Sequence, residues 1–242
     1  MSGDVRVVQR VSVIIPTLNE AGCIAATLAS LGALRGRGHE LIVVDGGSRD
    51  ATVSLARELA DRVVCSAAGR AEQMNAGAGA ATGDVFLFLH ADTRLPGNAD
   101  SLVLQGLADA AADWGRFDVR IAGAHPLLRV VETMMNWRSR VTRICTGDQC
   151  IFVRREAFEA VGGYPRQELM EDIAISARLR RLSSPACLRE PCLTSARRWE
   201  SGGVLRTIVM MWWLRLQYAL GAPPARLARA YGRHRQGETV PK

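Results

Sequence analysis

Three aspartates stand at the ends of predicted secondary-structure elements, where a carboxylate can bind a ligand. Asp92 comes shortly after five apolar residues, 85–89, Asp45 follows the apolar run 41–44, and Asp172 opens a predicted helix. An apolar run of this kind is typical of a strand that is buried on both faces of a parallel sheet. Ligands of such sheets bind beyond the carboxyl ends of the strands. A carboxylate there is desolvated unless a positive charge meets it, so a divalent cation is a candidate partner of Asp92.

Each of these aspartates also has a purely structural explanation. Asp45 suits a turn in Asp-Gly-Gly, Asp92 suits a cap or turn before the next proline, and Asp172 suits the first turn of a helix, where its charge complements the helix dipole. One such carboxylate at an edge of the sheet could arise by chance, but three at corresponding edges are less expected by chance. We therefore treat the three carboxylates as one candidate site.

The elements that would position these carboxylates alternate along the chain. Predicted strands cover residues 11–15, 41–44, 63–65, 85–89, 117–121 and 149–153, and predicted helices cover residues 21–31, 50–60, 70–80, 100–112, 127–144 and 170–182. Alternating strands and helices predict a parallel sheet with right-handed crossovers. We expect a single α/β domain, regular in its first half and less regular in its second.

The composition allows a sizeable core and restricts the class of partner. The chain has 242 residues, of which 48% are hydrophobic, and a formal net charge of +7. A basic balance favours anionic partners, although solvated helix faces explain most of the clustered arginines. Nucleic-acid binding would need a known module or interleaved exposed aromatics, and the sequence has neither. The six cysteines have no zinc-type spacing and no signal peptide is visible, so we expect reduced thiols in the cytoplasm.

Residues 204–220 form a strongly apolar segment that contains Trp212, Trp213 and Tyr218. Arg206 and Arg215 interrupt the segment, which is too short and too charged to span a bilayer. Two interpretations stay open, a buried helix and an interfacial helix that contacts a membrane. A short basic amphipathic tail follows the segment.

The glycine-rich stretch at residues 69–79 does not match the phosphate-binding loop, because it lacks the spacing G-x-x-x-x-G-K-[ST]. Its small residues instead favour a helix that packs closely against its neighbours. Arg70, at the start of this stretch, is a candidate fork for a diphosphate.

Four motifs together resemble one enzyme family. They are VIIPTLNE at residues 13–20, VVDGGSRDAT at residues 43–52, His-Ala-Asp at residues 90–92 and Glu-Asp at residues 171–172. Their order and spacing are similar to those of the inverting family 2 nucleotide-sugar glycosyltransferases of the A-type fold, over almost the whole chain. Further segments, at residues 115–120, 146–149, 169–172 and 195–200, resemble the small bacterial members of the arsenosugar-biosynthesis type.

The resemblance implies an α/β fold with one A-type domain at residues 1–203, in which helices flank a mostly parallel central sheet. Residues 11–112 would form the nucleotide-binding half, and residues 113–203 would form the acceptor half. Residues 204–242 would form a helical extension, with an apolar helix, that packs on the domain or on a membrane surface.

The resemblance also implies roles for individual residues. Asp172, with Glu171 beside it, would be catalytic, and Asp172 would act as the general base for the acceptor hydroxyl. Asp45 would bind the nucleotide base, commonly uracil, and Asp92, with His90, would bind a divalent cation, Mn²⁺ or Mg²⁺, that bridges the diphosphate. The residues that would bind the donor and its cation are Pro16, Thr17, Asn19, Glu20, Asp45, Gly46, Ser48, Arg70, Asn75, Asp92, Arg197, Arg198 and Trp199.

The implied partners are a nucleoside-diphosphate sugar, in particular a UDP-sugar, and a small-molecule or lipid-linked acceptor. Nucleic acid is not implied. A cytoplasmic location follows, with peripheral contact to the inner face of the membrane as a further expectation.

Two positions depart from the family pattern. His90 stands where the metal motif usually begins with aspartate, so one carboxylate is lost, and a histidine ligand would favour manganese or another transition ion. Ser195 stands where the later motif usually has glutamine or arginine, and Arg197 is a candidate substitute.

Two other functions compete with glycosyl transfer. A sugar-phosphate nucleotidyltransferase would need a glycine-rich loop with arginine and lysine after the first strand, and residues 16–20 do not form such a loop. A non-catalytic nucleotide- or anion-binding protein, associated with a membrane, is the third interpretation, and His90 keeps it open.

Overall fold

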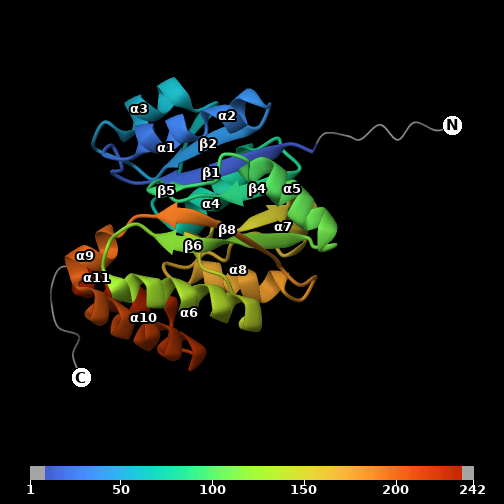
Figure 1. The fold of residues 1–242 in the computed structure, drawn as a ribbon. Helices are drawn as coiled ribbons and strands as arrows, with labels where there is room; N and C mark the ends of the chain where they lie inside the picture. Colours follow the sequence, from blue (N-terminus) through green and yellow to red (C-terminus); the bar gives the residue numbers. More distant parts are fainter. Residues whose placement is uncertain (1–8, 236–242) are drawn as a thin grey trace.

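The computed structural model describes residues 9–235, without the side chains of residues 198, 201 and 233–235, and these residues contain one eight-stranded sheet (Figure 1). Its strand order is β3-β2-β1-β4-β7-β6-β8-β5. The strands are β1 (Val11–Thr17), β2 (Glu40–Asp45), β3 (Arg62–Cys65), β4 (Val85–Phe88), β5 (Thr93–Arg94), β6 (Trp114–Ile121), β7 (Phe152–Arg154) and β8 (Ala186–Thr194).

The strand directions place the carboxyl ends of most strands at the same edge of the sheet. β3, β2, β1 and β4 pair in parallel, and β6 pairs in parallel with β8. β7 is antiparallel to both β4 and β6, so β6 and β8 run in the same direction as β1, β2 and β4. The carboxyl ends of these five strands therefore lie at one edge of the sheet. The mixed, mostly parallel sheet confirms the predicted α/β fold.

Helices cover both faces of this sheet. They are α1 (Ile24–Ser30), α2 (Gly32–Gly36), α3 (Thr52–Leu59), α4 (Arg70–Ala80), α5 (Ala99–Asp109), α6 (Pro126–Thr142), α7 (Arg155–Ala160), α8 (Glu171–Leu179), α9 (Arg197–Gly202), α10 (Val204–Ala219) and α11 (Pro224–Arg235), with a 3₁₀ turn, η1 (Gly147–Gln149). Figure 1 shows α1, α2 and α3 together near β1 and β2, whereas α6, α10 and α11 gather at the opposite end of the molecule.

Alternate residues of the central strands supply two apolar cores, one on each face. Val13 of β1 packs in the core that includes residues of α1, α3 and α5, and Ile14 packs in the core that includes residues of α4, α7 and α8. Leu87 and Phe88 of β4 divide in the same way, because successive side chains of a strand point to opposite faces. This arrangement confirms the two-sided burial expected from the run 85–89.

Gly77 of α4 lets that helix lie directly on the sheet. A Cβ atom at this position would lie 2.9 Å from Val44 Cγ2 and would come closer still to Ile14. The predicted close packing of the glycine-rich helix is therefore confirmed. The helix begins at Arg70, so this packing also fixes that arginine beside the carboxyl end of β1.

Several regions differ from the sequence-based expectation, and two of them, β7 and β8, belong to the second half of the sheet. The strand expected at residues 149–153 starts only at Phe152, because Gln149 closes a capping box with Thr146 and Cys150 has a left-handed φ of 49°. β8 was not expected, since its residues include charged side chains and Pro191, and its pairing with β6 is interrupted by a bulge. Proline is tolerated in a sheet at such a bulge.

The C-terminal helices pack beside the start of α8. Met210 and Leu214 of α10 join Leu227 of α11 and Met170, which directly precedes α8, in one apolar cluster. Gly203 separates α9 from α10 with a φ of 75°. The domain boundary expected at this point stays a prediction, and residues 236–242 of the expected extension lie outside the described residues. Within residues 9–235, no helix is long and apolar enough to cross a membrane.

Candidate active site

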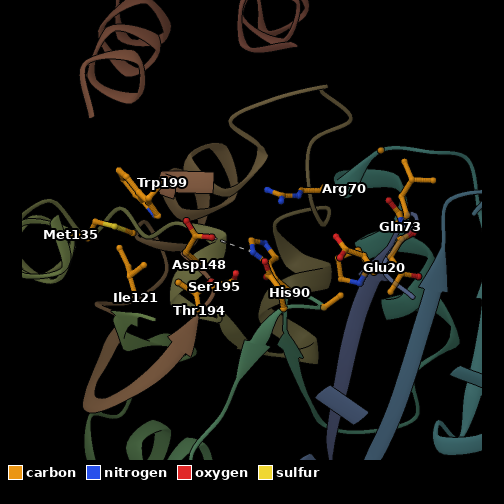
Figure 2. Close-up of a pocket in the computed structure, with 16 residues that line it drawn as sticks. Glu20, Arg70, Gln73, His90, Ile121, Met135, Asp148, Thr194, Ser195 and Trp199 are labelled. Carbon is orange, nitrogen blue, oxygen red and sulfur yellow. Dashed lines mark hydrogen bonds and ion pairs between the residues drawn. The ribbon is translucent and has the colours of Figure 1, made fainter. Parts of the chain in front are cut away.

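One cavity of about 310 Å³ lies beyond the carboxyl ends of β1, β4, β6 and β8. Figure 2 shows Glu20 and Gln73 on one side of the cavity, Met135 and Trp199 on the opposite side, and His90 between them. The predicted site residues that line this cavity are Pro16, Thr17, Glu20, Arg70, His90, Asp92 and Trp199. The parallel strand ends thus bring together residues that are distant in sequence, as expected for an open α/β sheet.

Asp45, at the end of β2, has one satisfied and one unsatisfied carboxylate oxygen. Its Oδ2 accepts hydrogen bonds from the backbone N–H groups of Gly47, at 3.0 Å, and Ser48, at 2.9 Å. Its Oδ1 is buried and has no hydrogen-bond partner among the described residues, and the side chain as a whole is 3% exposed. Buried polar atoms are normally paired. The free oxygen is therefore suited to accept a hydrogen bond from a ligand.

Asn19 and Ser48 join the loops that follow β1 and β2. The backbone N–H of Asn19 donates to Ser48 Oγ at 2.8 Å, and the N–H of Arg49 donates to Asn19 Oδ1 at 2.9 Å. Asn19 holds a left-handed φ of 56°, which asparagine tolerates better than most residues. These contacts fix the two loops relative to each other beside the cavity, with Gly46 between them and against the side chain of Gln73.

Arg197 links two of the carboxylates at the cavity. Its Nη2 atom lies 3.0 Å from Asp92 Oδ2 and 3.1 Å from Glu20 Oε2. Hydrogen bonds to Asp92 and then to Glu20 raise the pKa of the Arg197 guanidinium above its ordinary value. The arginine is 58% exposed, so these ion pairs lie in contact with solvent. Arg197 therefore supplies a positive charge at the site where Asp92 meets the cavity.

Asp172 does not line the cavity, and Gly147 lies between it and His90. His90 Nδ1 is 3.3 Å from Asp148 Oδ1, and the His90 ring lies against Gly147, where a Cβ atom would be 2.6 Å from its Nε2. The backbone N–H of Gly147 donates to Asp172 Oδ2 at 3.0 Å. The first turn of α8 thus holds Asp172 next to the loop of Gly147 and Asp148, and Asp148 lines the cavity together with His90.

Residues 12–162 of the chain match the family model described as glycosyl transferase family 2. The chain belongs to glycosyltransferase family 2. It is 32% identical, over 216 residues, to a PGL/p-HBAD biosynthesis glycosyltransferase of Mycobacterium tuberculosis, and the match covers 82% of this chain and 80% of that protein. The chain is therefore a glycosyltransferase, as the motifs predicted, and its likeness to the arsenosugar-biosynthesis type stays a prediction.

Solved structures share the A-type fold of this glycosyltransferase. TarS of Staphylococcus aureus, in complex with UDP-GlcNAc, matches with a TM-score of 0.64 and 18% identity over 78% of this chain, which spans 59% of the TarS chain. The mannosyltransferase PcManGT of Pyrobaculum calidifontis, in complex with GDP-Man and Mn²⁺, matches with a TM-score of 0.63 and 22% identity, over 93% of this chain and 70% of that chain. These similarities confirm the predicted fold.

Other predicted site residues of the glycosyltransferase lie beside the cavity or apart from it. Asn75 exchanges two hydrogen bonds with the backbone of Tyr164, at 2.8 and 2.9 Å, and is not among the residues that line the cavity. Glu171 is buried at the first position of α8, beside Asp172. Arg198 lies in α9, and its side chain is outside the part of the chain that the structure describes.

The cavity residues that sequence reasoning missed include Gln73 and Asp148. Asp148 lines it and pairs with His90, and Gln73 lines it and donates from Nε2 to the carbonyl oxygens of Thr17 and Val44, at 2.7 and 2.8 Å. Gln73 was recognisable as a polar residue within a helix of small residues. Asp148 carried no comparable signal, because its contact with His90 depends on the fold.

The residues at the cavity fit a cation that a diphosphate helps to hold. The described residues include no group of three or more His, Cys, Asp or Glu side chains arranged to hold a metal ion alone. Mg²⁺ is typically bound by one or two carboxylates together with substrate phosphates and water. Asp92, exposed to the cavity, is such a carboxylate, whereas His90 is turned toward Asp148.

Proposed function

We propose that this glycosyltransferase transfers a sugar from a nucleoside-diphosphate donor to an acceptor hydroxyl, with inversion at the anomeric carbon. The observation that supports the proposal is that Asp92 lines the cavity, while Asp45 ends the neighbouring strand β2 and Asp172 contacts Gly147, the residue against which the His90 ring lies. Asp45 has a buried oxygen without a hydrogen-bond partner among the described residues, Asp92 forms an ion pair with Arg197, and Asp172 accepts a hydrogen bond from Gly147. The three environments suit recognition of the nucleoside, charge compensation and proton transfer.

A uridine nucleotide suits Asp45 best. With Oδ2 occupied by the N–H groups of Gly47 and Ser48, only Oδ1 can accept a further hydrogen bond. Uracil presents a single ring N–H, whereas guanine presents its N1–H and its amino group side by side. One free oxygen matches the single donor of uracil, and the second guanine donor would be left without a partner.

The diphosphate of the donor would lie between Arg70 and Arg197. Arg70 lines the cavity, and it forms no ion pair or hydrogen bond with another described residue. Trp199, buried against Ile121 and Leu128, forms the wall on the acceptor side of the cavity. Two guanidinium groups near one diphosphate would stabilise the charge that develops on the leaving group.

Asp172 would remove the proton from the acceptor hydroxyl as that oxygen attacks the anomeric carbon. The new carbon–oxygen bond forms on the face opposite the diphosphate, while the bond to the diphosphate oxygen breaks and the nucleoside diphosphate leaves with the electron pair. A divalent cation held by Asp92 and the diphosphate would offset part of that charge when bound. In this proposal His90 orders Asp148 and the Gly147 loop, and Glu171 supports Asp172 at the start of α8.

Titration calorimetry with nucleotides tests the donor part of the proposal. With Mn²⁺ present, we expect UDP to bind the parent protein more tightly than GDP. In Asp45→Asn the amide oxygen keeps the two backbone contacts and the NH₂ group faces the base, so UDP affinity is expected to fall about 10- to 100-fold. Asp109→Asn, an exposed change on α5, is the control and should bind UDP as the parent does. Equal UDP affinity in the parent and Asp45→Asn would contradict the assignment of Asp45.

We propose in addition that α6 and α10 contact an anionic membrane surface. Exposed apolar side chains recur at helical spacing on α6 and on α10, and these two helices pack together. The side chains are Val130, Met134, Trp137 and Val141 on α6, and Leu205, Val209, Trp212 and Leu216 on α10 with Leu220 directly after it, and their exposed fractions lie between 42% and 72%. Two apolar stripes with a tryptophan in each are typical of interfacial helices.

The charge beside these stripes favours anionic lipid over a second copy of the chain. Residues 201–235 contain six arginines and no aspartate or glutamate. Among them, the side chains of Arg206, Arg226 and Arg229 are exposed. A second copy would bring like charges together, whereas the cytoplasmic leaflet is rich in anionic lipid. This supports contact with the inner face of a membrane.

Vesicle co-sedimentation tests the membrane proposal. We expect the parent protein to bind vesicles of phosphatidylcholine with phosphatidylserine more strongly than vesicles of phosphatidylcholine alone. Replacing both stripe tryptophans, in Trp137→Ser with Trp212→Ser, should weaken binding about tenfold or more, because two large apolar side chains no longer enter the interface. The control is Leu182→Ser, an exposed apolar residue that follows α8 and lies outside both stripes. Unchanged vesicle binding by the double variant would contradict the proposal.

A further inference from the structure

The guanidinium of Arg138, on α6, is partly buried and has an unsatisfied hydrogen-bond donor. Its Nη2 atom is buried and has no hydrogen-bond partner among the described residues. Met135 lies one turn earlier on the same side of α6 and lines the cavity, since residues three apart share a helix face. Arg138 therefore lies one helical turn from the wall of the cavity, on the acceptor side.

Arg215 lies on α10, a helix that packs against α6. The preceding residue, Leu214, is fully buried in the cluster that includes Met170, at the entrance to α8. Within the described residues, the guanidinium of Arg215, like that of Arg138, forms no ion pair or hydrogen bond. The two arginines thus lie on helices that pack together, and both interact electrostatically with Asp172.

The electrostatics of both arginines agree with an uncompensated positive site. Burial and then the nearby charge of Arg215 lower the pKa of Arg138 to about 10, and Asp172 opposes the shift. Burial also lowers the pKa of Arg215, opposed by Asp172 and Asp148. The carboxylate of Asp172 accepts hydrogen bonds from the N–H groups of Gly147 and Ile173.

We propose that Arg138 and Arg215 bind a phosphate group on the acceptor substrate. Two guanidinium forks supply the directed donors and the double positive charge that a phosphate group requires. The proposal rests on the proposed function in one respect, since Asp172 must be the base that faces the acceptor hydroxyl. A phosphate held by these arginines would bring a hydroxyl of the same molecule to Asp172, and it would select phosphorylated acceptors over neutral ones.

Binding of inorganic phosphate tests this site. The parent protein is first saturated with UDP and Mn²⁺, so that the donor site is occupied, and phosphate is then titrated by calorimetry at constant ionic strength. We expect one phosphate site, and at least about a tenfold loss of phosphate affinity in Arg138→Gln and in Arg215→Gln, with UDP affinity unchanged. Arg215→Lys should retain part of the binding, because it keeps the charge and loses the fork.

The matched control is Arg140→Gln, which lies on α6 but is paired with Asp118 at 2.7 Å. It should bind phosphate as the parent does. If Arg138→Gln unfolds, Arg215→Gln and Arg215→Lys still decide the question. The proposal is overturned if the nucleotide-saturated parent binds no phosphate, or if the variants bind it as tightly as the parent. If UDP itself fails to bind, the donor assignment fails instead, and phosphate titration without nucleotide still reports on Arg138 and Arg215.

Discussion

Asp172→Asn is expected to lower the rate of sugar transfer about 10²- to 10⁴-fold, which is the usual contribution of a general base. The substitution keeps an oxygen that can accept from the N–H of Gly147, so this contact between α8 and the Gly147 loop is retained. The amide cannot take the proton of the acceptor hydroxyl, and only the chemical step should suffer. The measurement is the steady-state release of nucleoside diphosphate from a UDP-sugar, together with donor affinity by calorimetry.

A matched loss of donor affinity would argue against Asp172 as the base. In that case the residue would be required for the shape of the donor site rather than for proton removal. Asp148→Asn is the informative comparison, since Asp148 lies in the same loop region and pairs with His90. It should disturb the position of His90 and reduce transfer less than Asp172→Asn does.

Asp92→Asn is expected to weaken donor binding in the presence of Mn²⁺ about 10- to 100-fold, through loss of a charged ligand contact. The variant should also become insensitive to a chelator, whereas the same chelator should weaken donor binding by the parent protein. Titration of UDP-sugar with and without Mn²⁺ measures both effects in one experiment.

Glu20→Gln is the control for Asp92, because both carboxylates contact Arg197, at 3.1 and 3.0 Å. It changes the partners of that arginine without removing the carboxylate that we assign to the cation. Donor binding by Glu20→Gln should therefore still respond to Mn²⁺. If the chelator leaves the donor affinity of the parent protein unchanged, the assignment of Asp92 to a metal ion is contradicted.

The central strands and their carboxylates could be predicted from sequence because their signals are local. The run at residues 85–89 is apolar at every position, which specifies burial on both faces, and Asp45 and Asp92 follow such runs directly or closely. The parallel direction of these strands then determines that their ends meet. Asp172 was recognisable only as part of the Glu-Asp pair at a helix start.

The contacts across the cavity could not be predicted in this way. Arg197 is 177 residues from Glu20 and 105 residues from Asp92 in the chain, and only the pairing of β8 with β6 and β5 brings it to them. The pattern of β8 is weak because a bulge and Pro191 interrupt it. Once this strand is in place, Arg197 contacts Glu20 and Asp92, and its role as a substitute for the residue missing at Ser195 stays a prediction.

The anomeric configuration of the first product tests the central proposal most directly. A UDP-α-linked sugar is incubated with the parent protein, with water as the acceptor where no other is supplied, and the released sugar is followed by proton NMR before its anomers equilibrate. A single displacement with Asp172 as base predicts that the β-anomer forms first, and that Asp172→Asn forms it far more slowly. An α-anomer as the first product would contradict inverting transfer.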